Sequence, residues 1–202
     1  MEAAAGEPRI EKDKAKRIVD AMRSSVAKRG VAGSTFDHVA REAQVSRGLL
    51  HYYFGTKERL LAEVVRRDTE LRLRLLDDRL ACAETADDFV ALLAFSLQEM
   101  VSEAPELVTL AFELFTLSRR NPEIAAELAK MLQRIREHLA ALLAAKQDEG
   151  VLNLRAEPEA IADILFSISD GVALRMLADP GHDFAATARA GILAARAFLD
   201  DR

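Results

Sequence analysis

The chain has 202 residues, of which 50% are hydrophobic and 30% are charged, a composition typical of folded globular proteins rather than disordered ones. Its apolar runs are shorter than the ~18 residues that a membrane-spanning helix requires, and the acidic N-terminus lacks the apolar core of a secretion signal. The single cysteine, Cys82, excludes an intrachain disulfide and a thiolate-cluster metal site. These features favour a cytoplasmic protein without a membrane partner.

The formal net charge of −5 hides an uneven distribution along the chain. Residues 1–60 contain 12 Lys and Arg against 8 Asp and Glu, whereas residues 61–202 contain 16 against 25. A basic first third on an acidic remainder predicts that only the first part meets a polyanion such as DNA.

Apolar residues recur at helical spacing and no segment alternates as a strand would, so the sequence predicts an all-α fold of about nine helices. Residues 1–8 are expected to form a disordered tail. The first helix is expected over 12–29, ended by Gly30, and the second starts at a capping box in which Ser34 and Asp37 satisfy backbone donors. A short third helix follows at 47–53. Caps and prolines predict the remaining helices at 57–80, 85–103, 105–119, 121–149, 157–178 and 183–199.

The first three helices can share one small core, because the two short ones cannot bury enough surface alone. The residues expected in this core are Ile18, Met22, Val26, Phe36, Val39, Ala40, Val45, Leu50 and Phe54. A short helix braced in this way fits the major groove of DNA, which is about 12 Å wide. Its outward positions are Arg47, Gly48, Leu49, His51 and Tyr52. Glycine is costly inside a helix, and a close approach of DNA to Gly48 would explain its presence.

The segment Ala43-Gln44-Val45-Ser46-Arg47-Gly48-x-Leu50-x-x-Tyr53-Phe54-x-x-Lys57-Glu58-x-Leu60 resembles the helix-turn-helix of the TetR family of bacterial transcriptional regulators. The resemblance implies a three-helix DNA-binding domain over 9–56, joined to a larger helical domain over 57–202 that binds ligand and dimerises. The chain departs from the family pattern at Gln44, where the turn usually has glycine, and at Leu49 and the pair His51-Tyr52 on the outward face.

The same resemblance implies a set of DNA contacts. Phosphates are expected to meet Ser34, Thr35, Tyr52, Thr56 and Lys57, partly at helix N-termini. Arg47 is expected at a guanine or a phosphate, His51 at a base edge or a phosphate, and Leu49 at a thymine methyl. Ser46 and Gly48 complete the set. An alternative for Ser34 and Thr56 is that they only cap helices.

The larger domain offers candidates for a ligand pocket and for a dimer interface. The pocket candidates are Phe89, Phe95, Met100, Phe112, Phe115, Met131 and Phe166, although aromatic and Met residues at helical spacing also occur as plain core. The interface candidates, on two helices with little polar surface, are Ile161, Ile168, Val172, Ala188, Gly191, Ile192, Ala195 and Phe198. A monomer with one very buried helix is the alternative. Asp170-Gly171 interrupts the more apolar of these helices, either as a buried acid paired with a residue such as Arg175 or as a polar edge turned outward.

These observations together predict a ligand-responsive transcriptional regulator, in the form of a repressor that binds a palindromic operator as a homodimer. A small, largely apolar effector would release it. The alternative is a dimeric helical adaptor protein that has lost specific DNA binding. No catalytic site, cofactor or metal is expected, because the four histidines form no i,i+4 pair and no phosphate loop or nucleophile motif is present.

Overall fold

The computed structural model describes the backbone of residues 7–199 and the side chains of residues 13–199. Within this range every regular element is an α-helix, which confirms the all-α prediction and the expected number of helices. They are α1 (Glu7–Gly33), α2 (Phe36–Ala43), α3 (Arg47–Phe54), α4 (Lys57–Leu80), α5 (Ala86–Glu103), α6 (Pro105–Ser118), α7 (Pro122–Asp148), α8 (Pro158–Ala178) and α9 (Ala185–Leu199). Most of the expected tail, residues 1–6, lies outside the described residues, and α1 already begins at Glu7.

The helices form two compact units. The first contains the chain up to Asp68 together with Thr109–Leu128, and the second contains Thr69–Val108 and Ala129 onward. The packing boundary in α4 therefore lies at Asp68, not at the expected position between residues 56 and 57. The reason is that the first turns of α4 bury Leu60, Leu61 and Val64 completely or nearly so.

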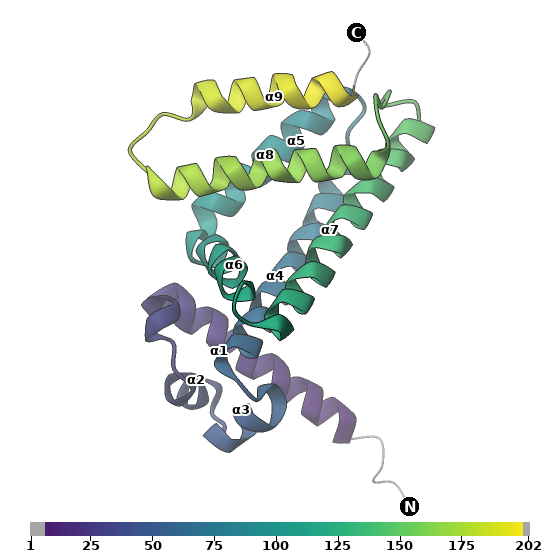
Figure 1. Cartoon of the computed structure of the whole chain (residues 1–202). Coiled ribbons are helices and arrows are strands. Elements are labelled where there is room, and N and C mark those ends of the chain that lie inside the picture. Colours follow the sequence, from purple (N-terminus) through teal and green to yellow (C-terminus); the bar gives the residue numbers. More distant parts are fainter. Residues whose placement is uncertain (1–6, 200–202) are drawn as a thin grey trace, which may run out of the picture. The chain divides into compact units, whose positions relative to one another are not determined.

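In the first unit, α1, α2 and α3 pack around a shared apolar centre, and α2 lies against α1 (Figure 1). The expected core is confirmed for Ile18, Met22, Val26, Phe36, Val39, Ala40 and Leu50, each at most 8% exposed. Val45 and Phe54 are half-buried instead. An ion pair between Arg59 of α4 and Glu123 at the start of α7 joins two further helices of this unit, with Arg59 Nε 2.8 Å from a carboxylate oxygen.

Helix α1 is bent near its end because Gly30 adopts a non-helical backbone with φ 68° and ψ 174°. The sequence correctly marks Gly30 as the end of the straight helix, and one more turn follows to Gly33. Two side chains satisfy carbonyl groups exposed by this bend. Ser34 Oγ donates to the Gly30 oxygen at 2.8 Å, and Lys57 Nζ donates to the Val31 oxygen at 2.6 Å.

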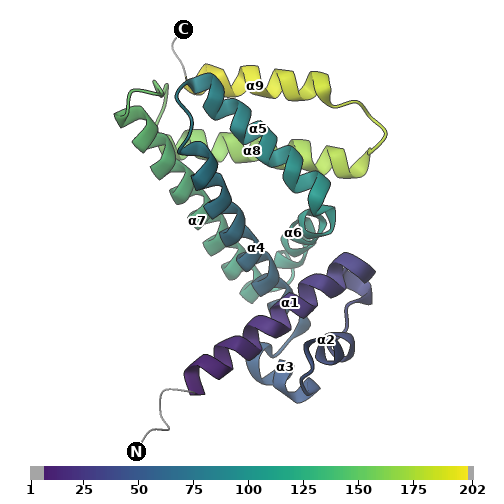
Figure 2. The same ribbon diagram turned by 180° about the vertical axis from the view of Figure 1, so that it is seen from behind.

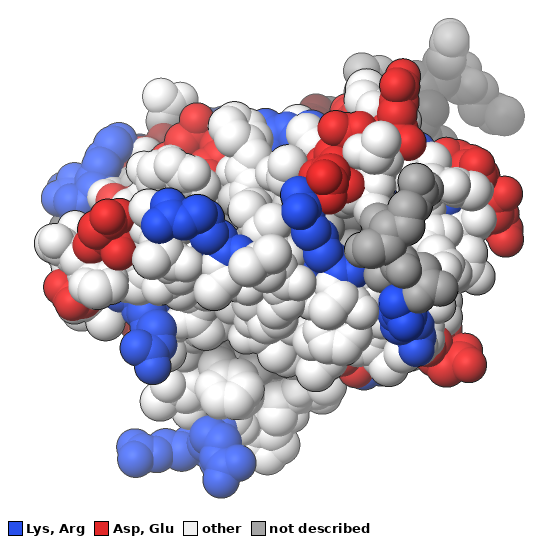
Figure 3. Space-filling view, turned by 90° about the horizontal axis from the view of Figure 1, so that it is seen from above, with Lys and Arg blue, Asp and Glu red and all other residues white. Residues whose placement is uncertain are grey.

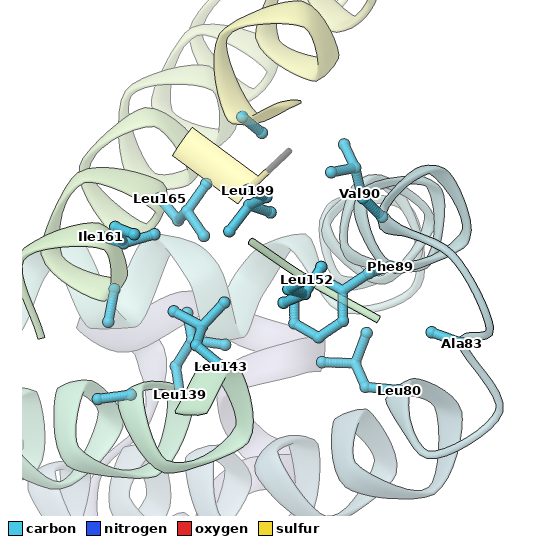
Figure 4. Packing of buried hydrophobic residues seen from close by; sticks show 14 residues of the cluster. Leu80, Ala83, Phe89, Val90, Leu139, Leu143, Leu152, Ile161, Leu165 and Leu199 are labelled. Carbon is cyan, nitrogen blue, oxygen red and sulfur yellow. The ribbon is translucent and has the colours of Figure 1, made fainter. Parts of the chain in front are cut away.

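The second unit is held together by an apolar cluster from α4, α5, α7, α8 and α9. Figure 2 shows the ribbons of these helices from behind. Figure 4 shows the ring of Phe89, which is fully buried, beside Leu152 and near Leu80. Lys146 of α7 is 7% exposed and donates to the carbonyl oxygens of Ala81 and Ala83, both at 3.2 Å. Its ammonium group therefore supplies hydrogen bonds to carbonyl groups just past the end of α4, a region where carbonyl groups have no partner within the helix.

Helix α8 runs without interruption through Asp170 and Gly171, and both residues are exposed. Of the two interpretations of this pair, the outward-turned polar edge is the one that the structure contains. None of the described helices has the length and apolar character needed to cross a lipid bilayer.

Candidate DNA-binding surface

Helix α3 is a short helix anchored on one side and exposed on the other. Ser46 caps its start, where the Ser46 hydroxyl accepts from the Leu49 amide at 3.3 Å, and Leu50 is fully buried beneath it. The outward residues are exposed, including Arg47, Gly48 and His51, with Tyr52 at 74%. Leu49 is half-buried. Most of the expected outward face is therefore available to a partner while α3 stays fixed to the first unit.

The turn before α3 has a backbone conformation that glutamine rarely adopts. Gln44 adopts the left-handed conformation with φ 54° and ψ 47°, and its amide points back to the carbonyls of Ala40 and Arg41. Side chains other than Gly, Asn and Asp disfavour this region by about 1–2 kcal/mol. The departure from glycine at this position therefore leaves the turn geometry intact at an energetic cost.

Arg47 at the start of α3 forms an ion pair across this turn. Its guanidinium lies 3.3 Å from the Asp37 carboxylate in the first turn of α2. The side chains of Arg47 and Asp37 are 60% and 62% exposed. Such an exposed pair contributes little to stability. It does, however, place a negative charge beside the residue expected to approach DNA.

His51, one turn further along α3, is held by two contacts. Nδ1 lies 3.0 Å from the Gly55 carbonyl oxygen, and the ring packs edge-on against Phe36 with 4.9 Å between the centroids. Gly55, which ends α3, has φ 69°, a conformation that favours glycine.

The hydroxyl residues around α3 separate into caps and a buried group. Thr35 caps α2, accepting from the His38 amide at 3.3 Å, and Thr56 caps α4, accepting from the Arg59 amide at 3.2 Å. Both are exposed, so each can cap a helix and still face a phosphate. Ser34 is fully buried and bonded to Gly30.

Two expectations for Ser34 were therefore wrong. The cap of α2 is Thr35 and not Ser34, since the backbone turns helical one residue later than the pattern suggested. A buried hydroxyl that already donates to a carbonyl cannot reach a phosphate, so Ser34 is removed from the expected DNA contacts. Lys57 is half-buried and its ammonium bonds to Val31, which leaves two of its three donor hydrogens for another acceptor.

Comparison with known proteins decides the family. Residues 18–64 match the family model described as bacterial regulatory proteins, tetR family, and residues 84–199 match a tetracyclin repressor-like C-terminal domain. The HTH-type transcriptional regulator BetI of Rhizobium meliloti is 30% identical over 164 residues, which cover 79% of this chain and 76% of BetI. The chain belongs to the TetR family. It is therefore a DNA-binding transcriptional regulator and not an enzyme.

Solved structures agree with this TetR-family fold. The FadR regulator of Bacillus subtilis, in complex with stearoyl-CoA, has a TM-score of 0.70 at 18% identity, covering 89% of this chain and 96% of FadR. A regulator from Saccharomonospora viridis, in complex with choline, has a TM-score of 0.72 at 19% identity, covering 94% and 99% of the two chains. These similarities concern the fold, and the ligands are those of the two neighbours.

The expected pocket residues of this TetR-family chain differ in burial and are divided between the two units. Phe89 is a core residue, as the alternative interpretation allowed, and Phe112 and Phe115 belong to the first unit. The remaining four, in the second unit, are Phe95, Met100, Met131 and Phe166. Phe95 is 54% exposed, and the guanidinium of Arg79 lies 5.2 Å from the centroid of its ring. The other three are half-buried.

The expected interface residues also divide by burial. Ile161 and Ala195 are 1% and 7% exposed and belong to the chain's own core, so they support α8 and α9 from within. Ile168, Val172, Gly191, Ile192 and Phe198 are half-buried, and Ala188 is exposed. Three apolar residues outside the expected set are more exposed, namely Ile164 and Leu174 of α8 and Leu193 of α9, at 43%, 50% and 64%. Sequence periodicity marks all of these positions as apolar but does not separate the two sides of the helices.

Proposed function

We propose that this TetR-family protein is a repressor, which binds a palindromic operator in the cytoplasm as a homodimer and is released by a small-molecule inducer. The observation that carries the proposal is the exposed side of α3, which presents Arg47, His51 and Tyr52 while Leu50 anchors the helix from behind. A helix held in this way can insert into a major groove without a change in the fold of the first unit.

The apolar residues on α8 and α9 support the homodimer. Ile164, Leu174 and Leu193 expose large side chains on neighbouring helices of the second unit. Figure 3, which looks onto α9, shows a continuous area of uncharged atoms in the middle of this face. A second copy that covered these residues would remove apolar surface from water, at roughly 25 cal/mol for each Å² buried.

The dimer can be tested with one matched pair of substitutions. Leu193→Glu should shift the protein from dimer to monomer in sedimentation equilibrium, because it would bury a charge in the interface. Leu132→Glu, at a 46% exposed leucine of α7, should leave the dimer intact. A Leu193→Glu protein that remained dimeric would place the interface elsewhere.

The inducer in this proposal is a small, largely apolar molecule that binds the second unit. Met100, Met131 and Phe166 offer partly exposed apolar surface there. The neighbours' ligands, stearoyl-CoA and choline, differ widely in size and charge, so they support a small-molecule effector without identifying it. Helices α4, α6 and α7 each pass from one unit to the other. A ligand that prefers one of two conformations of the second unit could therefore shift the first, but only by its difference in affinity for the two.

Selection from random double-stranded DNA at low and at moderate salt tests operator binding. We expect an enriched palindrome whose half-site centres lie about 34–36 Å apart, or a multiple of that distance. Arg47→Ala should weaken binding to it, whereas Arg134→Ala removes the same charge from an exposed arginine of the second unit and should not. If no palindrome is enriched and binding vanishes at moderate salt, only nonspecific charge attraction is left, as the adaptor alternative expects.

A further inference from the structure

The imidazole of His51 is oriented by groups that dictate which of its nitrogens carries hydrogen. Nδ1 lies 3.0 Å from the carbonyl oxygen of Gly55. A carbonyl oxygen can only accept a hydrogen bond, so Nδ1 must be the donor. A neutral imidazole has a single N–H, which leaves Nε2 without hydrogen and able only to accept.

The backbone of Gly55 fixes this arrangement. The Gly55 amide donates to the carbonyl oxygen of His51 at 2.9 Å, and α3 ends there. Gly55 has φ 69° and ψ −62°, and in this conformation its own carbonyl oxygen lies beside the imidazole. The His51 ring also packs edge-on against Phe36, which is 8% exposed and part of the core. The ring thus contacts both a buried aromatic and a backbone carbonyl, while the residue as a whole remains exposed.

We propose that His51 reads the exocyclic amino group of a base, N6 of adenine or N4 of cytosine, through its unprotonated Nε2. The inference rests on the proposed insertion of α3 into the major groove. Those two amino groups are the hydrogen-bond donors that base edges present in that groove. Phosphate oxygens, and the N7 and O6 atoms of guanine, offer only acceptors. A neutral Nε2 gains no hydrogen bond from them, so of the two partners expected for His51 the base edge is favoured over the phosphate.

The first step of the test identifies the base that His51 contacts. Operator selection is run at about pH 8 with the wild type, His51→Ala and His51→Phe. The phenylalanine variant keeps a ring against Phe36 but lacks both nitrogens. Both variants should lose sequence preference at the same single position of each half-site and keep it elsewhere. Tyr52→Phe, which alters a neighbouring exposed residue, should retain the preference at that position.

The second step removes single atoms from the DNA at that position. If the contacted base is adenine, purine lacks the amino group and 7-deazaadenine lacks the N7 acceptor; if it is cytosine, 2-pyrimidinone lacks the amino group and 7-deazaguanine in the opposite strand removes N7. Loss of the amino group should weaken wild-type binding about fivefold beyond its effect on His51→Ala, as expected for one hydrogen bond. Comparison with the variant subtracts the effect on base pairing itself. Loss of N7 should affect both proteins equally.

Three results would overturn the inference while leaving the proposed function in place. The His51 variants could lower affinity for all sequences alike, which indicates a phosphate contact. The wild type could be weakened more than His51→Ala by loss of N7, which indicates that Nε2 donates. The variants could also bind like the wild type. Failure of the wild type to select any palindrome is a different outcome, because it would contradict the proposed operator binding itself.

Discussion

Replacement of Gly48 by alanine should stabilise the free protein and weaken its binding to DNA. Gly48 is the second residue of α3 and is exposed. A Cβ atom built at this position would lie 3.9 Å from the Ser46 hydroxyl oxygen, its nearest neighbour outside the adjoining residues and the backbone of α3, which is an ordinary van der Waals distance. Nothing within the first unit therefore requires a glycine here.

The stability gain follows from the backbone. Glycine inside a helix costs roughly 0.5–1 kcal/mol relative to alanine, because its unfolded chain has more conformational freedom. For a protein of this size, that difference should raise the thermal midpoint by about 1–4 °C, measured by circular dichroism.

The binding loss follows from what α3 faces. If the backbone of α3 approaches DNA closely at Gly48, an added methyl group must push the two apart and lengthen the surrounding polar contacts. We expect a loss of about tenfold or more in affinity for the selected operator, equivalent to roughly 1.4 kcal/mol. Fluorescence anisotropy with labelled operator DNA, at fixed salt, measures it directly.

A second substitution separates the two effects. Gly48→Ser carries a larger side chain with a weaker helix preference than alanine, so it should bind DNA less well than Gly48→Ala while being less stable. Binding by Gly48→Ala that equals the wild type would refute the close approach. A lower thermal midpoint for Gly48→Ala would refute the claim that the free protein has no use for this glycine.

Three further substitutions test other parts of the first unit. Gln44→Gly relieves the strain of a left-handed residue, and should raise the free energy of unfolding, measured in urea, by about 0.5 kcal/mol. The gain is small because the flexibility of glycine in the unfolded chain offsets part of it. No gain would mean that the Gln44 side chain stabilises the turn. Asp37→Asn removes a carboxylate 3.3 Å from Arg47, and should raise the affinity for random DNA a few-fold at low salt. It should also lower the preference for the operator over random DNA, which competition binding would detect. Partial burial raises the pKa of Glu63, but hydrogen bonds from Arg66 and Arg67 outweigh it and hold that pKa below its ordinary 4.5. The resulting stability is present above pH 4.5 and is lost as the pH falls through the lowered value, so thermal midpoints of Glu63→Gln should drop less on acidification than those of the wild type.

The sequence predicted the helices and the first core well, because both depend on patterns that recur within a few residues. Val39 and Leu50 could be placed inside from helical spacing alone, and both are fully buried. The hydroxyl residues were harder. Ser34 and Thr35 are adjacent and both suit a helix cap, and the choice between them depends on where the backbone turns helical, which is at Phe36.

The second unit shows a different limit of sequence reasoning. Ile161 and Leu193 both lie on apolar sides of their helices, yet one is 1% exposed and the other 64%. Helical periodicity reports that a face is apolar but not whether the same chain or another copy covers it. The same limit applies to Phe89 and Phe95, six residues apart on α5, of which one is in the core and the other is 54% exposed.

Three polar residues of the candidate DNA-binding surface are bonded to nearby backbone groups. Ser46 accepts from the Leu49 amide, Thr56 from the Arg59 amide, and His51 meets the Gly55 carbonyl. Because these partners do not depend on side-chain identity, an exposed residue of α3 can change while the helix keeps its place on Leu50. We therefore expect the departures from the family pattern at His51 and Tyr52 to alter which DNA sequence α3 prefers rather than how α3 is held.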